Sequence, residues 1–211
     1  MNPKQVSLIS RLGKLAGLFF IFALSGQAFA GTAPDQLVKQ TADKVLEKVL
    51  ANKEGMKADT SRLYNLVNSD VLPHFDFEMM SQRVLGKYWR SATPGEQGSF
   101  VKEFRQLLVR TYATALLNYS GQEIEYKPFR MTEGENTAVV KTAVRNSGGP
   151  AIPIDYRLYL TKDGQWKVFD LKIDGVSLIS NYRTSFGGEV RQIGVGGLVK
   201  RLAQRNTAKG S

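Results

Sequence analysis

The first half of the chain carries its apolar residues at intervals of three and four. From Pro34 to Asn52 this spacing is that of one face of an α-helix, and the proline suits its first turn. A second stretch starts after Asp59, which can cap a helix, and ends at Pro73, which cannot continue one. The apolar positions of the two stretches are Val38, Ala42, Val45, Val49, Leu63, Leu66, Val67 and Val71. Two amphipathic helices are therefore predicted.

The strongest helix start in the chain lies at residues 93–96. The sequence Thr-Pro-Gly-Glu is a capping box, in which the threonine oxygen accepts from the glutamate amide and the glutamate side chain reaches back. The helix that it opens is predicted to run to about Asn118, with Gly121 as its terminator. Another helix precedes it, capped by Asp76 and running to about Trp89.

After residue 121 the apolar period changes to two. Alternating segments at 122–130, 138–145, 152–160 and 166–173 predict four strands. Glycine-containing pairs between them suit hairpin turns. In the last segment the apolar face changes side after Val168, and a β-bulge near Phe169 would reconcile its two halves.

Four helices followed by four antiparallel strands predict one α+β domain, with the sheet half covered by helices. A further helix is expected to start at Gly175. The glycines at 187–188 and 194–197 are interpreted as loose punctuation before a basic terminal piece. The sequence contains no internal repeat, no low-complexity linker and no sign of a second domain.

Residues 1–30 have the three parts of a secretory signal peptide. A basic start without acids is followed by an apolar core at 15–24 and an A-x-A cleavage site at 28–30. The apolar core is about half as long as the roughly 20 residues that span a bilayer. We therefore expect cleavage before Gly31, which leaves a single domain over residues 31–211 that is large enough for a sizeable core.

The chain has no cysteine, one histidine and a formal net charge of +10. Without cysteine, disulfides, thiol chemistry and cysteine–metal sites are excluded. An exported domain of this kind must be stable through its core alone, which fits the periplasm. The positive charge favours anionic lipid surfaces or acidic protein faces as partners, and export argues against nucleic acid. A solvated basic surface without a specific partner is the simpler interpretation.

Sequence motifs of catalysis are missing. There is no nucleophile elbow, Walker loop, HExxH pair or Rossmann glycine pattern. His74, at a helix entry, is interpreted as an exposed or capping residue, and no metal site is expected. Asp170 shares a predicted strand face with Trp166, and an ion pair with an arginine is favoured there over catalysis.

Large apolar side chains are instead in excess on the helix that starts at residue 93. Two neighbouring stripes hold Phe100, Phe104, Leu107, Leu108, Thr111 and Ala115, and Val101, Tyr112, Leu116 and Tyr119. Together they are wider than the roughly 100° needed to pack onto one sheet. Each residue alone is explained as ordinary core, but the set favours a lined apolar cavity.

Two blocks of the sequence resemble the periplasmic phospholipid-binding proteins of the MlaC, or toluene-tolerance, family. The first block holds Phe75, Phe77, the run VLGKYWR from Val84 to Arg90, Ala92-Thr93-Pro94, Phe100, Phe104-Arg105 and Leu107 to Tyr112. The second, from Trp166 to Ile179, is similar to the last strand and following helix of that family. The similarity covers most of residues 31–211.

The resemblance implies an α+β fold, NTF2-like in outline, in which helices and a curved, mainly antiparallel four-stranded sheet enclose an apolar pocket. It implies a soluble periplasmic phospholipid carrier, without catalytic activity, that holds acyl chains inside and the head group outside. The pocket walls are then expected at Val84, Leu85, Leu108, Tyr112, Leu116, Tyr156, Val176 and Ile179. From their charge alone, five cations are expected near the pocket mouth or on a partner surface: Lys87, Arg90, Arg105, Arg145 and Arg183.

The partners that the resemblance implies are an outer-membrane lipoprotein–porin complex and an inner-membrane ABC transporter complex. Movement of phospholipid between them would maintain the lipid asymmetry of the outer membrane. Two alternatives stay open. One is a small-molecule enzyme of the isomerase or dehydratase type, with Asp170 or Tyr112 as the base in an apolar pocket. The other is a lipid-free envelope adaptor that uses only its basic face.

Overall fold

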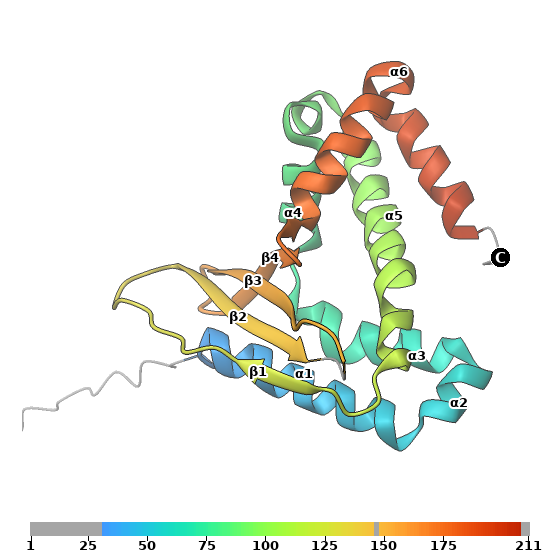
Figure 1. The fold of residues 1–211 in the computed structure, drawn as a ribbon. Helices are drawn as coiled ribbons and strands as arrows, with labels where there is room; N and C mark the ends of the chain where they lie inside the picture. The colour runs from blue at the N-terminus through green and yellow to red at the C-terminus, as the bar shows by residue number, and fades with distance from the viewer. Residues whose placement is uncertain (1–30, 146–147, 208–211) are drawn as a thin grey trace, which may run out of the picture.

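The computed structural model describes residues 31–145 and 148–207 of the chain. The predicted signal peptide, residues 1–30, lies outside the described residues. Helices occupy the first half of the described part and its C-terminal 30 residues, with an antiparallel sheet between them in the sequence (Figure 1). Among the described helices, none is long and apolar enough to cross a lipid bilayer.

Three helices form the base of the molecule: α1 (Pro34–Ala51), α2 (Lys53–Ala58) and α3 (Thr60–Leu66). α1 confirms the first predicted helix, whereas α2 was not predicted. Asp59 caps α3 as predicted, because its carboxylate accepts a hydrogen bond from the Ser61 amide at 3.0 Å. Beyond α3 the helix is irregular, with a π-helical turn η1 (Val67–Val71) and a 3₁₀ turn η2 (Leu72–His74). A proline in η2 accounts for this change, since it lacks the next amide donor and its ring clashes with the preceding turn.

The two central helices begin as the sequence predicts. The Asp76 carboxylate caps α4 (Phe77–Leu85) by accepting from the Met79 amide at 2.8 Å. The capping box of α5 (Pro94–Tyr112) is complete, with the Glu96 amide donating to Thr93 Oγ1 at 3.3 Å and the Thr93 amide donating to the Glu96 carboxylate at 2.9 Å. Both helices end earlier than predicted and continue as 3₁₀ turns, η3 (Gly86–Ser91) and η4 (Ala113–Asn118).

The sheet has the order β1-β2-β3-β4-β5, and each neighbouring pair is antiparallel. Its strands are β1 (Glu123–Tyr126), β2 (Thr137–Arg145), β3 (Ile152–Leu160), β4 (Trp166–Ile173) and β5 (Val176–Ser177). Between β3 and β4 the pairing passes from Arg157–Asp170 to Leu158–Val168, so Phe169 is the extra residue of a bulge. The predicted bulge is confirmed. It places Val168, Phe169 and Asp170 in buried positions one after another.

All four predicted strands are present, but the helix expected to begin at Gly175 does not begin there, and a short fifth strand precedes it. Asp174 and Gly175 both have positive φ, 47° and 82°, and turn the chain back so that Val176 pairs with Ile173. Two consecutive residues of positive φ are typical of a tight hairpin turn, which explains why this pair carries an aspartate and a glycine. β5 is the result, and the last helix starts at Leu178, three residues later than its predicted position.

The glycine-rich tail is helical, which corrects its interpretation as loose punctuation. α6 (Leu178–Thr207) contains both glycine clusters and is broken at Gly194, whose φ of 70° and ψ of 174° are not helical. The two arms fold back on each other beside α5 (Figure 1). Their buried residues are Leu178, Ile179, Phe186, Val190, Val195, Leu198, Leu202 and Asn206. Burial of this apolar face outweighs the low helix propensity of glycine, about 1 kcal/mol per residue.

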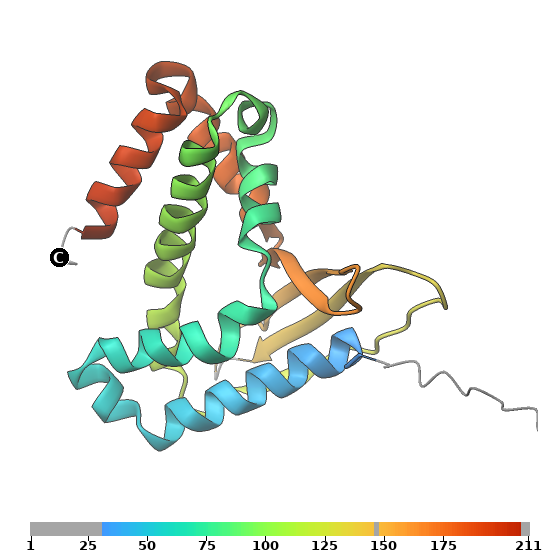
Figure 2. The ribbon, with the colours of Figure 1, turned by 180° about the vertical axis from the view of Figure 1, so that it is seen from behind.

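The apolar core is divided into three clusters. The helix cluster joins α4, α5 and α6, which stand together as one helical body in Figures 1 and 2. The base cluster joins α1, α2, α3 and the turns η1, η2 and η4, whereas the sheet cluster packs α1 against β2, β3 and β4. The fold therefore has three separate apolar clusters, contributed by both helices and sheet, rather than one continuous core.

Candidate functional site

The three clusters meet at two aromatic side chains, Phe75 and Phe77. Phe75 packs against the helix and sheet clusters, and Phe77 packs against the helix and base clusters. Their rings stack with centroids 6.0 Å apart, and both side chains are only half-buried. We call this pair the central junction. A ligand bound between the clusters at this pair would contact all three.

Backbone contacts hold the central junction in place. Phe75 forms a β-bridge with Val168, and the Asp76 amide donates to the Val168 carbonyl at 2.9 Å. The Asp76 carboxylate caps α4 and also accepts a hydrogen bond from the Tyr159 hydroxyl of β3. Burial and this hydrogen bond raise the pKa of Tyr159 to about 12, so the phenol stays protonated and remains a donor at neutral pH. One aspartate thus ties the helical body to the sheet.

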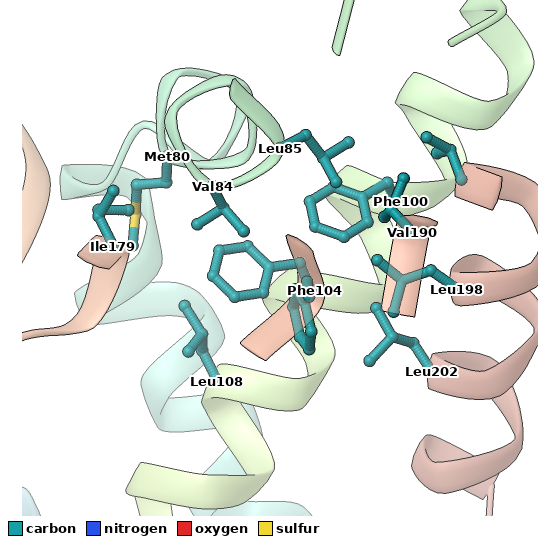
Figure 3. Packing of buried hydrophobic residues seen from close by; sticks show 12 residues of the cluster. Met80, Val84, Leu85, Phe100, Phe104, Leu108, Ile179, Val190, Leu198 and Leu202 are labelled. Carbon is teal, nitrogen blue, oxygen red and sulfur yellow. The ribbon is translucent and has the colours of Figure 1, made fainter. Parts of the chain in front are cut away.

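Four of the eight residues predicted to form the pocket walls lie in the helix cluster. Val84, Leu85, Leu108 and Ile179 are all buried there, and they come from α4, α5 and α6. Figure 3 shows Val84 pointing toward the ring of Phe104 and Ile179 lying beside Met80. The structure therefore brings residues from both matching blocks of the sequence into one buried apolar cluster.

The other four predicted wall residues lie apart from that cluster. Leu116 is half-buried against the base cluster, and Tyr156 is half-buried against the sheet cluster. Tyr112 and Val176 are 36% and 56% exposed. Val176 was placed in a helix from the sequence, but it lies in β5, and this change of element explains why its side chain is exposed rather than turned into the helix cluster.

Tyr156 of β3 packs against the sheet cluster, between α1 and the sheet. Burial raises the pKa of its phenol, and a hydrogen bond with Thr142 opposes that effect. The side chain nevertheless keeps accessible surface. The phenol therefore stays uncharged at neutral pH, and its half-buried position suits apolar groups of a ligand better than charged ones.

Asp170, the carboxylate that the sequence singles out, is 2% exposed and holds the start of α6. Its two oxygens accept from the Ser177 hydroxyl at 2.8 Å and the Ile179 amide at 3.2 Å. Arg157 lies 3.6 Å away on β3, so the predicted pairing with an arginine is confirmed. These partners anchor the last helix to β4.

The five predicted surface cations are exposed but lie on four different elements. Lys87 and Arg90 share η3, where the Lys87 ammonium lies 5.2 Å from the Tyr88 ring centre. Arg183 of α6 donates to the Arg83 carbonyl at 2.7 Å. The structure thus places two predicted cations on η3 and one on the first arm of α6, where it contacts α4, and the other two lie on α5 and β2.

Those two cations are engaged locally. Arg105 of α5 donates to Asn68 Oδ1 at 3.1 Å and lies 5.8 Å from the ring centre of Phe77. Arg145, at the end of β2, pairs with Glu125 at 2.8 Å. Arg105 therefore contacts the central junction from outside, whereas Arg145 braces two strands at the edge of the sheet.

Several residues of the site were not predicted from the sequence. In the sequence, Phe75 and Phe77 were singled out only as part of the block that resembles the family. Two aromatic residues two positions apart, between two predicted helices, could have indicated a contact between elements. Arg83 and Arg157 lie 4.4 Å and 5.2 Å from the ring centre of Phe169. No sequence signal indicated this contact, because its members come from α4, β3 and the bulge of β4.

Two grooves lie on the surface, and the central junction lines neither of them. One of about 610 Å³ lies between α1 and β1, and another of about 550 Å³ lies between α3 and α5. None of the eight predicted wall residues lines either groove, and only Arg105 among the predicted cations does. Within residues 31–145 and 148–207, no three histidine or acidic side chains gather in a way that could hold a metal ion.

Fold and site together define an α+β protein whose apolar interior is shared by a helical body and an antiparallel sheet. Comparison with known proteins places it more narrowly. The model of the family described as MlaC protein matches residues 39–204. The chain belongs to this family.

Characterised relatives cover most of the chain. It is 30% identical over 185 residues to the intermembrane phospholipid transport system binding protein MlaC of Haemophilus influenzae, which covers 87% of this chain and 86% of that protein. It is 28% identical over 166 residues to toluene tolerance protein ttg2D of Pseudomonas putida, which covers 78% of this chain and 76% of that protein.

A solved structure has the same fold. The phospholipid-binding protein from Ralstonia solanacearum, determined in complex with a phospholipid, aligns with a TM-score of 0.76 at 34% sequence identity. The alignment covers 84% of this chain and 97% of that chain. The fold described above is therefore one that holds a phospholipid in a similar protein.

Proposed function

We propose that this protein is a periplasmic phospholipid carrier that moves lipid between the outer and inner membranes and so maintains the lipid asymmetry of the outer membrane. Membership of the MlaC family and the similar structure with bound phospholipid support the ligand class. The observation that carries the proposal is the division of the core into three clusters that meet at half-buried Phe75 and Phe77. Acyl chains lie between the clusters at this central junction, against Tyr156 and Leu116.

The energetics of transfer favour a carrier of this kind. Two acyl chains contain about 30 methylenes, each worth roughly 0.8 kcal/mol in transfer from water, so the gross cost of an unaided crossing is on the order of 20 kcal/mol. An apolar interior removes most of this cost. Exchange with a membrane is then close to balance, and release requires a partner that binds the lipid-free and lipid-bound forms with different affinity.

The partners in this proposal are an outer-membrane lipoprotein–porin complex and an inner-membrane ABC transporter complex. The exposed cations Lys87 and Arg90 on η3, and Arg183 on α6, are suitable contacts for acidic faces of either one. We propose no catalytic step. Both oxygens of Asp170 are occupied by Ser177 and Ile179, which leaves it poorly placed as the base that the enzyme alternative needs.

The test is native mass spectrometry of the chain purified from the periplasm, followed by organic extraction. We expect the protein to carry phospholipid at a defined ratio of lipid to protein, and the extract to contain the masses of that lipid. A Phe77→Asn variant should lose most of this lipid, because the amide places unpaired polar groups at the central junction. Val176→Asn is the matched control, since the same amide at a residue 56% exposed should leave the lipid in place.

Circular dichroism and urea denaturation check that both variants are folded. A folded parent chain that carries no lipid, and gains no mass after incubation with phospholipid vesicles, would contradict the proposal. Equal lipid content in the two variants would move the acyl chains away from the central junction.

A further inference from the structure

The first strand of the sheet has a free edge. β1 pairs with β2 on one side, and it is the first strand in the order of the sheet. The Lys127 amide donates to the Lys141 carbonyl at 3.0 Å, which fixes the phase of this antiparallel ladder. Residues 125 and 123 are therefore the ones hydrogen-bonded to β2, and the amides and carbonyls of Ile124 and Tyr126 point away from it. Within the described residues, no hydrogen bond to these outward groups is present.

Ile124 and Tyr126 also line a groove. It has a volume of about 610 Å³ and is walled by the C-terminal half of α1 and by residues 119–126. Leu46, Leu50 and Ile124 provide its apolar surface, and Leu50 is 49% exposed. At one end the Tyr126 hydroxyl donates to Asp43 at 3.2 Å and links the strand to the helix. None of the lining residues belongs to the three core clusters, so the groove is separate from the central junction.

The groove is acidic on a basic protein. Its charged lining residues are Lys39, Asp43, Glu47 and Glu123, on a chain whose formal net charge is +10. Lys39 and Asp43 neutralise each other at 2.6 Å, and Glu123 lies 3.8 Å from Arg145. Glu47 is exposed and, within the part of the chain that the structure describes, has no ion pair. After these pairs the groove keeps the negative charge of Glu47, which a cationic group of a ligand would match.

We propose that this groove binds an extended basic segment of a partner protein, which adds as a further strand to β1. The partner backbone exchanges hydrogen bonds with Ile124 and Tyr126, as in other cases of strand addition to a sheet edge. Alternate side chains of the segment are apolar and contact Leu46, Leu50 and Ile124, and a lysine or arginine pairs with Glu47. β1 has four residues and is about 13 Å long, so the matched segment has roughly four to six residues.

The decisive variant is Ile124→Pro. Proline is tolerated on an edge strand where the lost amide points away from the sheet, so β1 keeps its ladder with β2 but loses one outward donor. Ile124→Val is the matched control, because it keeps that amide. Charge is tested with Glu47→Lys, and Glu133→Lys is the control, since Glu133 is also exposed but lies in the loop between β1 and β2.

The probe is a displayed library of random nine-residue peptides, selected against the chain over residues 31–211. We expect enriched peptides in which apolar residues alternate with lysine or arginine. Ile124→Pro and Glu47→Lys should each weaken their binding by roughly tenfold or more, and the two controls by less than about twofold. Bound peptide should also slow the exchange of the Ile124 and Tyr126 amides, while circular dichroism stays that of the parent chain for each variant.

Three results would overturn the proposal. One is a selection that enriches no peptide. Another is enriched peptides that bind Ile124→Pro as tightly as the parent chain. The third is a dimer of the free chain, seen by sedimentation and abolished by Ile124→Pro, since the edge would then be occupied by a second copy rather than by a partner. None of these results bears on lipid content, so the carrier proposal is tested independently.

Discussion

At the scale of single residues, carboxylates organise this protein. Asp59, Asp76 and Asp170 each accept backbone or hydroxyl hydrogen bonds at the start of a helix. Asp170 differs from the other two because it is almost completely buried. A buried carboxylate is tolerated only where donors replace its hydration, and here Ser177, the Ile179 amide and Arg157 do so.

Asp170→Asn should lower the free energy of unfolding by about 1–3 kcal/mol, the range for hydrogen bonds to a buried charged group. The amide keeps the shape of the side chain but replaces one acceptor oxygen with a donor that faces Ser177 or the Ile179 amide. Urea denaturation at pH 7 measures the change. Glu133→Gln, at an exposed loop position, is the control and should stay within about 0.5 kcal/mol of the parent chain. An Asp170→Asn variant as stable as that control would show that the anchor is dispensable.

Helix caps could be predicted residue by residue from the sequence, and long-range contacts could not. The capping box at 93–96 and the caps at Asp59 and Asp76 depend on amides within three residues. The second role of Asp76, as acceptor for Tyr159, joins residues 83 apart in the chain. No local pattern encodes such a contact, because it exists only once the sheet and α4 are packed together.

At the scale of elements, α6 shows how packing decides what a glycine-rich sequence does. Gly187 lies inside a regular helical arm, whereas Gly194 has a φ of 70° and turns the chain so that the second arm can fold back. That arm is held by Asn206, whose amide nitrogen donates to the Glu103 carbonyl of α5 at 2.9 Å. Glycine therefore has two different roles within eight positions: Gly187 continues a helix and Gly194 breaks one.

The two glycines should respond to alanine with opposite signs. Gly194→Ala forces a side chain into a conformation that is nearly restricted to glycine and should cost about 1–3 kcal/mol. Gly187→Ala should stabilise the protein by about 0.4–1 kcal/mol, because nothing lies within 4 Å of the added methyl and the unfolded chain loses freedom. Thermal and urea denaturation measure both changes. Equal effects of the two substitutions would mean that the break in α6 is not required by its backbone.

An ion-pair group joins α1 to the π-helical turn η1. The Asp70 carboxylate lies 2.6 Å from the Lys48 ammonium and 3.0 Å from that of Lys44. Hydrogen bonds from Lys48 first, and then from Lys44, hold the pKa of the Asp70 carboxyl below its ordinary value. These ion pairs hold the π-helical turn η1 against α1. The spacing of apolar residues predicted a regular α-helix there.

The stabilisation that this group contributes should depend on pH. Because the pKa is lower in the folded than in the unfolded chain, the contribution is fully present above the unfolded value of about 3.9 and is lost as pH falls through the lower folded value. Asp70→Asn should therefore reduce the free energy of unfolding at pH 7 and have a smaller effect at pH 3. Urea denaturation at both pH values tests this, and a difference that does not change with pH would contradict it.

At the scale of the whole molecule, the important feature is a core in three parts. The helix, base and sheet clusters are each closely packed, and they are joined through two half-buried phenylalanines. A small domain with one continuous core would gain more from burial. The division is understandable if the molecule completes its core with an apolar ligand.

Removal of lipid should therefore lower the stability of the entire molecule. A ligand that binds only the folded chain stabilises it by about 2.7 kcal/mol when present at roughly 100 times its dissociation constant. Differential scanning calorimetry before and after delipidation should show a lower melting temperature without lipid. Amide exchange should quicken most at residues 75–77 and least in the edge strand β1. An unchanged melting temperature would mean that the three clusters are complete without a ligand.

The sequence by itself determined the order of the longer helices and of the first four strands, the starts of α1, α3, α4 and α5, the bulge at Phe169 and the resemblance to the MlaC family. These depend on interactions within a few residues or on alternation along one strand. Only the tertiary structure decided that 176–177 form a strand, that the glycine-rich tail is a broken helix, and that Val84, Leu108 and Ile179 share one buried cluster while Tyr112 and Val176 do not. The reason is physical. Burial depends on which distant elements meet, and the energy of that packing exceeds the local preferences that a sequence pattern records.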